Sequence, residues 1–579
     1  MRKGQMQIII KVIKYIKKYM FFILLSLSCA VITVIFSLYI PILTGNAIDL
    51  IIGKNNVEMS GIAEILLKML IYIGISALAS WLMNISNNKI VYNTIRDIRR
   101  DAFEKIQNIP IKNIDEIAHG DMVSRVIADV DQFADGLLMG FTQFFTGVLT
   151  ILGTIYFMVT IDFKISLVVV LLTPLSFFVA RYISKKTYSM FQLQSKTRGE
   201  QTTLIDEMVG NEKLVQAYCY EDEAIERFDE VNERLKKSSL TAIFFSSLTN
   251  PCTRFINSLV YTGVGLTGAF TAIKGGISIG QLTCFLSYAN QYTKPFNEIS
   301  GVVTELQNAI ACAARIFELL DMKDQDINEE AIDICNPKGN IEFKDVSFSY
   351  VQGKDLLKNL NLKVNVGQTV AIVGPTGCGK TTFINLLMRF YDIDSGIITL
   401  DGIDINNITR ESLRTSYGMV LQDTWLRSGT IKDNILMARP EATDEEVLDA
   451  AKKSHAHSFI KRLSKGYDTF IGEDGGNLSQ GQEQLLSITR ALISKPTMLI
   501  LDEATSSIDT RTELKIQQAF DEIMKGKTSF IVAHRLSTIR NADIILVMKD
   551  GNIIEQGNHE TLLKEKGFYY TLYNSQFSS

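Results

Sequence analysis

The sequence contains no pattern of cysteine or histidine residues that suits a metal ion. Its seven cysteines are scattered along 579 residues, and none forms the CxxC pair of many zinc sites. His455 and His457 are two positions apart, so on a helix they face different directions. Cys29, Cys252 and Cys284 lie in apolar runs, where a small hydrophobic side chain is the simpler interpretation. The sequence therefore predicts no zinc site.

The sequence also lacks a basic block of the kind that binds nucleic acid. Charged residues make up only 21% of the chain, and the net charge at pH 7 is −4. A protein that binds a polyanion usually carries clustered positive charge. We therefore expect no nucleic-acid partner.

Hydrophobic residues are abundant, at 46% of the chain, but they are unevenly spread. Long apolar runs fill roughly the first 320 residues, whereas the rest alternates short strands and helices as a soluble α/β domain does. A polar, acidic stretch, Asp321–Gly339, separates the two parts. Because 579 residues are too many for one domain, we predict a transmembrane domain over residues 1–322, a linker over 323–339 and a soluble domain over 340–579.

Six apolar runs in the first part are long enough to cross a bilayer, which needs about 20 residues. Residues 1–18 carry six lysines or arginines ahead of the first run, and no small-residue cleavage site follows it. We therefore interpret this run as a retained signal anchor. The six predicted spans are Met20–Ile42, Ile62–Ile85, Gly136–Ile161, Ile165–Tyr182, Leu240–Ile273 and Ile277–Ser300.

Basic residues alternate between the segments that lie outside these spans. In chain order the segments hold six, one, seven, one, ten and one lysines or arginines. Cytoplasmic segments carry the excess of positive charge. The N-terminus, both long loops and the soluble domain are therefore predicted to be cytoplasmic, in a multi-pass protein of the plasma membrane that contacts membrane lipids.

The two long basic segments have the composition of helices rather than loops. No proline interrupts Ile62–Asn108, which as one helix would rise about 70 Å, more than twice the bilayer core of about 30 Å. Pro110 is predicted to stop this helix, and His119–Asp121 to make a second break. Two helical hairpins would then enter the cytoplasm and end in short turns near Lys112–Gly120 and Asn211–Glu221. These tips could carry force to a soluble domain, or they could be solvated linkers.

Few charged residues lie within the predicted spans. Arg254 follows Asn250–Pro251, and Glu298 and Glu305 lie late in the sixth helix, Glu305 just after the predicted span. A charge at the middle of the bilayer costs about 2.5–3.5 kcal/mol on insertion scales, so each could line a substrate path. Near the cytoplasmic end of a helix, a solvated side chain is the alternative.

A phosphate-binding loop dominates the second part of the chain. It matches G-x-x-x-x-G-K-[ST] without a mismatch, between an apolar strand at Thr369–Val373 and a helix at Thr382–Phe390. Backbone N–H groups and the helix N-terminus would bind phosphate, with Lys380 on the β- and γ-phosphates and Thr381 on Mg²⁺. The loop consists of Gly374, Pro375, Thr376, Gly377, Cys378, Gly379, Lys380 and Thr381.

Cys378 lies inside this loop, near Lys380 and a helix N-terminus. Both neighbours favour the thiolate, so we predict a reactive thiol that MgATP protects. The alternative is a small filler in place of serine or alanine.

Four further residues have the chemistry of nucleotide hydrolysis. The strand Met498–Leu501 ends in Asp502, which can hold the Mg²⁺ shell, and Glu503, which can polarise the attacking water. Gln422 could reach both the metal and the water. His534 follows the apolar strand Phe530–Ala533, and the strand end is expected to face the nucleotide.

Ser479 and Gln482 have the S-x-x-Q spacing of a capping box, and a helix is predicted to run from there to Lys495–Pro496. This helix N-terminus offers N–H groups to a second phosphate contact, which we expect to be made across a dimer.

Together these motifs resemble those of ABC transporters, and six membrane helices fused to one ATPase domain look like an exporter-type half-transporter. The resemblance implies a multidomain fold, with a six-helix α transmembrane domain that has long cytoplasmic extensions, followed by an α/β P-loop ATPase domain. It also implies that Tyr350 stacks on adenine, that Gln422 is the Q-loop glutamine and that His534 is the switch histidine. Gly472–Gly475 resembles the exporter loop that touches the partner's coupling helices. The tips of the two predicted hairpins match the positions of such coupling helices. The ATP contacts that it implies outside the loop are Tyr350, Thr382, Gln422, Ser479, Gly481, Gln482 and Asp509.

The family signature is Leu-Ser-Gly-Gly-Gln, whereas this chain has Gln480 at the first glycine. A chain that combines this change with intact hydrolysis motifs resembles one subunit of a heterodimeric bacterial multidrug exporter. The partner would then carry an intact signature and a weakened Walker B carboxylate.

The implied function is ATP-driven export of a small amphipathic or hydrophobic substrate, a drug or a lipid. A lipid flippase or peptide exporter that acts as a homodimer, and an importer of exporter shape, stay open as alternatives. Intact Lys380, Asp502 and Glu503 argue against an ATP-gated channel or regulatory subunit that only binds ATP.

Overall fold

The computed structural model of the chain describes residues 3–53, 56–325, 328, 330–351, 353–354, 356–421, 424–472, 476, 478–502, 508–532 and 536–577. The chain forms two compact units. The first, called here the membrane unit, consists of Met1–Asn108 and Ile117–Met322. The second, called here the ATPase unit, consists of Ile109–Glu116 and Lys323–Ser579.

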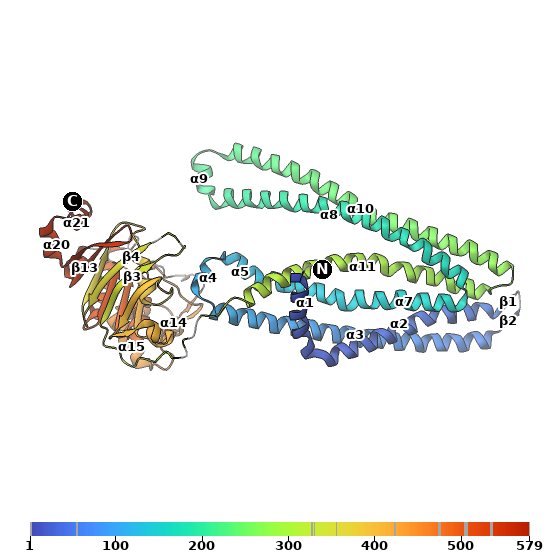
Figure 1. Cartoon of the computed structure of the whole chain (residues 1–579), viewed down its shortest axis with the longest axis horizontal. Coiled ribbons are helices and arrows are strands. Elements are labelled where there is room, and N and C mark those ends of the chain that lie inside the picture. The colour runs from blue at the N-terminus through green and yellow to red at the C-terminus, as the bar shows by residue number, and fades with distance from the viewer. Residues whose placement is uncertain are drawn as a thin grey trace. The chain divides into compact units, whose positions relative to one another are not determined.

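The membrane unit is built from long helices (Figure 1). Its helices are α1 (Lys3–Ile16), α2 (Met20–Asp49), α3 (Met59–Asn108), α5 (His119–Val126), α6 (Ala128–Met139), α7 (Phe145–Ile161), α8 (Phe163–Gly210), α9 (Glu212–Ala217), α10 (Glu221–Ile273) and α11 (Ile279–Leu320). Shorter elements are the 3₁₀ turn η1 (Lys17–Tyr19), the π-helical η2 (Gly140–Phe144) and the strands β1 (Ile51–Gly53) and β2 (Asn56–Val57).

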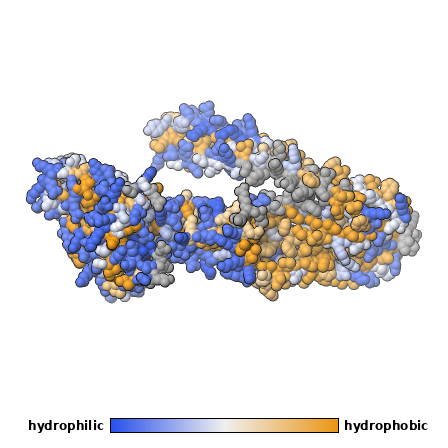
Figure 2. Space-filling model, in the orientation of Figure 1, coloured by the Kyte–Doolittle hydropathy of each residue, from blue (hydrophilic) through white to orange (hydrophobic). Residues whose placement is uncertain are grey.

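Large apolar side chains cover the outside of this unit. Phe21 of α2 is 73% exposed and Leu70 of α3 is 69% exposed, and Figure 2 shows the broad apolar surface to which such residues contribute. An apolar surface of this breadth suits contact with the hydrocarbon core of a membrane. Four helical stretches in the described part of the chain are long and apolar enough to cross a membrane: Met6–Asp49, Met59–Asn108, Gly120–Ile161 and Arg254–Ile273. All six predicted spans overlap helices.

The long helical hairpins are confirmed, with two corrections. Helix α3 continues without a break to Asn108, and Pro110 follows as expected. The predicted second break at His119–Asp121 is wrong, because helix α5 already begins at His119 and Gly120 lies in its first turn, where glycine is tolerated. The tips are also more ordered than simple turns, because each carries a short helix, α4 (Ile111–Asp115) and α9.

Helix ends within the membrane unit are joined by close packing. Gly45 of α2 and Gly280 of α11 cross so closely that a Cβ atom on either would collide with the other's carbonyl oxygen. The Asp49 carboxylate accepts a hydrogen bond from the backbone N–H of Gly280 at 2.7 Å.

Of the charges predicted near substrate paths, Arg254 is exposed and Glu305 accepts a hydrogen bond from Gln132 at 2.9 Å. The Glu298 side chain lies outside the described residues.

A six-stranded sheet forms the centre of the ATPase unit, in the order β14-β13-β5-β12-β11-β8. Five of its strands are parallel, and only β14 runs antiparallel. The strands are β5 (Thr369–Val373), β8 (Tyr417–Val420), β11 (Met498–Asp502), β12 (Thr528–Val532), β13 (Ile544–Lys549) and β14 (Asn552–Gly557). Parallel strands are buried on both faces, which explains their continuous apolar runs.

A second, antiparallel sheet has the order β4-β3-β6-β7. Its strands are β3 (Ile341–Phe348), β4 (Leu357–Val364), β6 (Ser395–Leu400) and β7 (Ile403–Asp404), and β9 (Gly429–Thr430) pairs separately with β10 (Phe470–Ile471). The remaining elements are α12 (Lys380–Leu387), η3 (Ile405–Asn407), α13 (Arg410–Thr415), α14 (Ile431–Leu436), α15 (Asp444–Lys453), α16 (His457–Ile460), η4 (Gly466–Asp468), α17 (Gln480–Ile493), α18 (Thr510–Met524), α19 (Leu536–Asn541), α20 (His559–Glu565) and α21 (Phe568–Phe577).

Two hydrophobic cores lie on opposite faces of the parallel sheet. Val370 and Ile372 of β5 face the core that α12 and the antiparallel sheet complete. Ala371 and Val373 face the core of helices α14 to α18. The alternation follows from the two-residue period of a strand. The helical transmembrane domain followed by an α/β ATPase domain agrees with the predicted fold class.

Candidate nucleotide site

The phosphate-binding loop connects the central strand β5 to helix α12, as the sequence predicts. Gly377 and Gly379 have φ angles of +82° and +103°, a conformation that favours glycine. A Cβ atom on Gly379 would lie 2.7 Å from a methyl group of Leu357, so this position also lacks space. The sharp turn brings the chain directly into α12, whose N-cap is Gly379.

Lys380 is the first residue of α12, and its side chain folds back over the loop. Its Nζ donates hydrogen bonds to the carbonyl oxygens of Gly374 at 2.7 Å and Pro375 at 3.1 Å. The amine therefore lies beside the loop backbone at a helix N-terminus, where an anion is favoured. These residues fit a bound polyphosphate, and the exposed Thr381 hydroxyl offers an oxygen donor beside them.

The neighbouring strands end at the same edge of the sheet as β5. Val532 of β12 pairs with Ile372 of β5 and with Asp502 of β11, and Val420 of β8 pairs with Leu501. Because these strands are parallel, their carboxyl ends lie together beside the loop. Asp502 is thus placed at the loop's edge of the sheet. Gln422, Glu503 and His534 lie outside the described residues.

Tyr350 follows strand β3 and is 37% exposed. Its ring packs edge-to-face with Phe348, with the ring centroids 4.9 Å apart. Its hydroxyl bonds with Thr382 Oγ1 at 3.3 Å and accepts a hydrogen bond from Asn385 at 3.3 Å. Two residues of α12 therefore fix Tyr350 and leave part of its ring open to a flat ligand.

The predicted capping box at the start of α17 is present. The Ser479 N–H donates to the Gln482 side-chain oxygen at 3.1 Å, and the Gln482 N–H donates to Ser479 Oγ at 3.4 Å. Ser479 and Gln480 are exposed, whereas Gly481 is buried. A Cβ atom on Gly481 would lie 2.5 Å from Thr512 Cγ2, so the helix start packs against α18.

Asp509 caps α18 by accepting hydrogen bonds from the N–H groups of Arg511 and Thr512 at 3.1 and 3.0 Å. The bond to Thr512 holds the pKa of the Asp509 carboxyl below its ordinary value. In the predicted exporter loop, Glu473–Gly475 lies outside the described residues.

The predicted thiolate character of Cys378 is wrong for this conformation. The side chain is only 3% exposed, and this burial raises the pKa of the thiol, although nearby Lys380 acts in the opposite direction. Loss of hydration of the charged form outweighs the favourable charge. Cys378 is thus a buried thiol whose burial favours the protonated form, and it packs in the core next to β5.

Sequence patterns did not reveal the contacts that hold α17. Thr424 donates a hydrogen bond to Glu483 at 3.1 Å. The Arg490 guanidinium donates to the Trp425 carbonyl at 2.7 Å and to the backbone and side-chain oxygens of Asn434 at 2.8 and 2.6 Å. These bonds tie the signature helix to the segment that follows Gln422. No local sequence motif marks them, because the partners are 56 or more positions apart.

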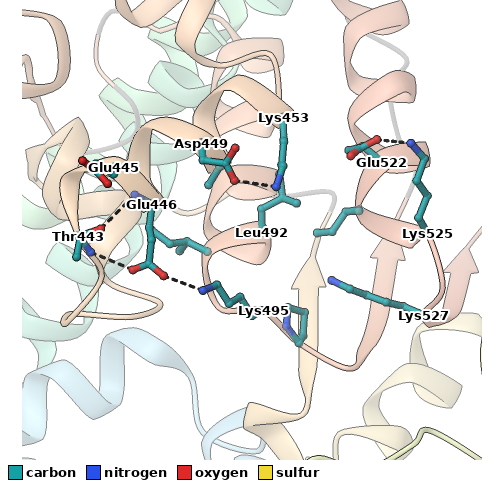
Figure 3. Close-up of a pocket in the computed structure, with 14 residues that line it drawn as sticks. Thr443, Glu445, Glu446, Asp449, Lys453, Leu492, Lys495, Glu522, Lys525 and Lys527 are labelled. Carbon is teal, nitrogen blue, oxygen red and sulfur yellow. Dashed lines mark hydrogen bonds and ion pairs between the residues drawn. The ribbon is translucent and has the colours of Figure 1, made fainter.

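A cavity of about 530 Å³ lies between α15 and the C-terminal ends of α17 and α18 (Figure 3). Lys453 pairs with Asp449 and Lys495 with Glu446, each at 2.7 Å. The cavity is next to Met498 and Thr528, where β11 and β12 begin, and so lies away from the edge that carries the phosphate-binding loop. It is therefore separate from the nucleotide site.

Comparison with known protein families matches both units. Residues 23–296 match the family described as ABC transporter transmembrane region, and residues 357–506 match the family described as ABC transporter. The chain belongs to the ABC transporter family. It is an exporter-type half-transporter, with a membrane domain fused to an ATPase that drives transport, and such a half requires a dimer partner.

Among relatives of this ABC transporter is the Bacillus subtilis protein named uncharacterized ABC transporter ATP-binding protein YfiC, which is 41% identical over 96% of this chain and 92% of its own length. The fatty acid ABC transporter ATP-binding/permease protein of Mycobacterium tuberculosis is 40% identical over 90% of this chain and 84% of its own. The ATP-dependent lipid A-core flippase of Syntrophus aciditrophicus is 34% identical over 92% of this chain and 88% of its own length. Together the family matches and these relatives indicate that this ABC transporter carries out ATP-driven export.

Proposed function

We propose that this ABC transporter exports a small amphipathic or hydrophobic molecule, a drug or a lipid, across the plasma membrane. The alternation of basic segments supports a cytoplasmic N-terminus and ATPase domain. The names of two relatives, a fatty acid transporter and a lipid A-core flippase, favour a lipid among the candidate substrates.

The observation that carries the proposal is the arrangement of the loop and the strand ends. Lys380 would hold the β- and γ-phosphates of ATP, and Thr381 and Asp502 would supply oxygen ligands to Mg²⁺, together with Gln422. Bound Mg²⁺ would neutralise phosphate charge. Glu503 would orient and polarise the attacking water, and His534 would contact the terminal phosphate.

The second ATP contact is proposed to come from another subunit. The described hydrogen bonds of the Ser479 and Gln482 side chains are with each other's backbone N–H groups, and Ser479 and Gln480 are exposed. The start of α17 is therefore available to a nucleotide held by a partner, with Ser479, Gly481, Gln482 and Asp509 around it. Gln480 places a side chain where glycine would let the backbone approach closely.

We infer that the partner is a different chain with an intact signature and a weakened Walker B carboxylate. The productive site would combine Lys380, Asp502 and Glu503 of this chain with the partner's signature. The other site, closed by Leu478–Gln482 of this chain, would hold ATP and turn it over slowly.

Co-expression tests the pairing. The chain is purified alone and together with a candidate partner encoded next to it, and the ATPase rates are compared. The proposal predicts a stable heterodimer that is much more active than the chain alone. A homodimer of equal activity would contradict it and favour the second candidate, a lipid flippase made of two copies, which the relatives' names also support. A Gln480→Gly variant serves as a control, because it should speed turnover at the slow site only.

A further inference from the structure

Helix α4, the tip of the first hairpin, is part of the ATPase unit. Ile111 packs against the core that α12 and the antiparallel sheet complete, and the Ile109 carbonyl accepts a hydrogen bond from Gln325 at 3.1 Å. Asp115 accepts a hydrogen bond from the hydroxyl of Tyr391. The hairpin tip is thus anchored on this domain through an apolar contact and two hydrogen bonds.

Tyr391 connects α4 to the proposed base-stacking residue. The rings of Tyr391 and Tyr350 are perpendicular, with their centroids 4.9 Å apart. Phe348 completes a cluster of three rings, 4.9 Å from Tyr350 and 5.7 Å from Tyr391. Such edge-to-face contacts favour one relative orientation. A change in the position of Tyr391 therefore changes the support of the Tyr350 ring.

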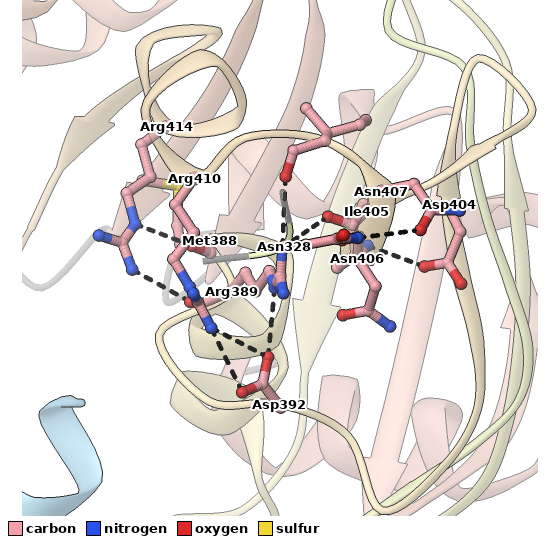
Figure 4. A network of polar contacts seen from close by, with 11 residues as sticks. Asn328, Met388, Arg389, Asp392, Asp404, Ile405, Asn406, Asn407, Arg410 and Arg414 are labelled. Atoms are coloured by element: carbon pink, nitrogen blue, oxygen red, sulfur yellow. Dashed lines mark hydrogen bonds and ion pairs between the residues drawn. The ribbon is translucent and has the colours of Figure 1, made fainter. Parts of the chain in front are cut away.

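Arg389 and Asp392, which flank Tyr391 in sequence, take part in a network of polar contacts (Figure 4). Arg389, which is only 8% exposed, donates to the carbonyl oxygens of Ile405, Asn406 and Ile408 at 3.1–3.3 Å and pairs with Asp392 at 3.2 Å. These contacts restrain the backbone on both sides of Tyr391, whose hydroxyl donates a hydrogen bond to Asp115. Burial and the Asp115 carboxylate also raise the pKa of Tyr391, so the hydroxyl stays a donor.

A cavity of about 260 Å³ lies at this junction. Its walls include the Tyr350 and Tyr391 rings, Lys112 and Asn113 of α4, and Gln325 of the linker. The hairpin tip therefore forms part of the wall beside the ring on which a base would stack.

We propose that Tyr391 and Asp115 are a positioning pair: the Tyr391 ring supports the Tyr350 ring for the nucleobase, and the hydrogen bond between Tyr391 and Asp115 makes the first hairpin tip sensitive to whether a base is bound. This inference rests on the proposed stacking of adenine on Tyr350. A base that fixes Tyr350 also restrains Tyr391 through the ring contact, and Tyr391 restrains α4 through Asp115. Neither residue belongs to the phosphate-binding loop.

The test separates base binding from phosphate binding in the assembled transporter. The KM for MgATP is measured together with the inhibition constant of magnesium tripolyphosphate, a competitor that has neither base nor ribose. We expect Tyr391→Leu to raise the KM for MgATP roughly two- to tenfold, the range of an aromatic pair, and to leave the tripolyphosphate constant unchanged. Equal shifts in both constants would mean a merely structural role and would overturn the inference.

Conservative variants test the anchor. Tyr391→Phe keeps the ring, so the KM should stay close to wild type while transport per ATP hydrolysed falls. Asp115→Ala should do the same, and the double variant should be no worse than either single one, because both remove one hydrogen bond. The inference would be contradicted if the double variant lost the sum of the two single losses in transport per ATP hydrolysed, or if the single variants left this ratio unchanged. Glu116→Ala, at the exposed neighbouring position, is the matched control and should change neither quantity.

Tyr350→Ala distinguishes this inference from the proposed function. If Tyr350→Ala leaves unchanged the ratio of the KM for MgATP to the inhibition constant of magnesium tripolyphosphate, the base does not stack on Tyr350 and the proposed site itself is wrong. If Tyr350→Ala raises the ratio but Tyr391→Leu does not, the site stands and only the positioning pair is refuted.

Discussion

Gly481→Ala is expected to destabilise the ATPase unit although it adds only one methyl group. The new Cβ atom would lie 2.5 Å from Thr512 Cγ2 and 3.1 Å from Ile508 Cγ2, whereas carbon atoms prefer about 3.5–4.0 Å. Ile508 precedes Asp509, and the Thr512 N–H donates a hydrogen bond to the Asp509 carboxylate. Moving either neighbour away from the new methyl group would therefore disturb the α18 cap. Overpacking of this kind costs about 1–3 kcal/mol.

Thermal unfolding of the full-length chain measures this cost. For a unit of this size, about 1 kcal/mol corresponds to about 2–4 °C, so the transition of the ATPase unit should fall by roughly 2–12 °C. The adjacent Gln480→Ala is the matched control, because Gln480 is exposed and such a change costs within about 0.5 kcal/mol.

A second substitution identifies the cause. Thr512→Ser removes the methyl group that the new Cβ meets but keeps the backbone N–H that Asp509 accepts. The Gly481→Ala/Thr512→Ser pair should therefore regain most of the lost stability. An unchanged transition in Gly481→Ala, or no recovery in the pair, would refute the packing argument.

Two further predictions concern the site itself. Glu503→Gln should bind MgATP and lose nearly all turnover, whereas Lys380→Ala should weaken binding or productive phosphate placement; near-normal hydrolysis in Glu503→Gln would refute its role as the group that positions water. Cys378 should react slowly with a small maleimide at neutral pH, faster as rising pH increases the thiolate fraction, and more slowly still with MgATP bound. Labelling of Cys378 as fast as that of the exposed Cys335 would show that burial does not protect the thiol. Full activity after complete labelling at Cys378 would contradict its place in the site.

Local signals in the sequence predicted the parts of the site that depend on local structure. Gly377, Gly379 and Lys380 define a loop that only a strand and a helix can flank, and the spacing of Ser479 and Gln482 defines a helix start. Both are present because few distant contacts can override such short-range geometry.

Properties that depend on distant contacts were missed. The pKa direction of Cys378 depends on how deeply the core buries it, which its neighbours in sequence do not reveal. The anchoring of α4 depends on a contact between Asp115 and Tyr391, 276 positions apart. The break near His119 was misplaced because glycine predicts a turn only on average, and the first helical turn also accepts it.

The most direct test of ATP-driven export is substrate movement in sealed inside-out membrane vesicles that contain the assembled transporter. With MgATP outside, these vesicles expose the ATPase domain if the predicted topology is correct. The vesicles should then accumulate an amphipathic dye or a labelled fatty acid, and Glu503→Gln vesicles should not. Accumulation without ATP, equal accumulation in Glu503→Gln, or ATP-driven loss of preloaded substrate would contradict export by this chain.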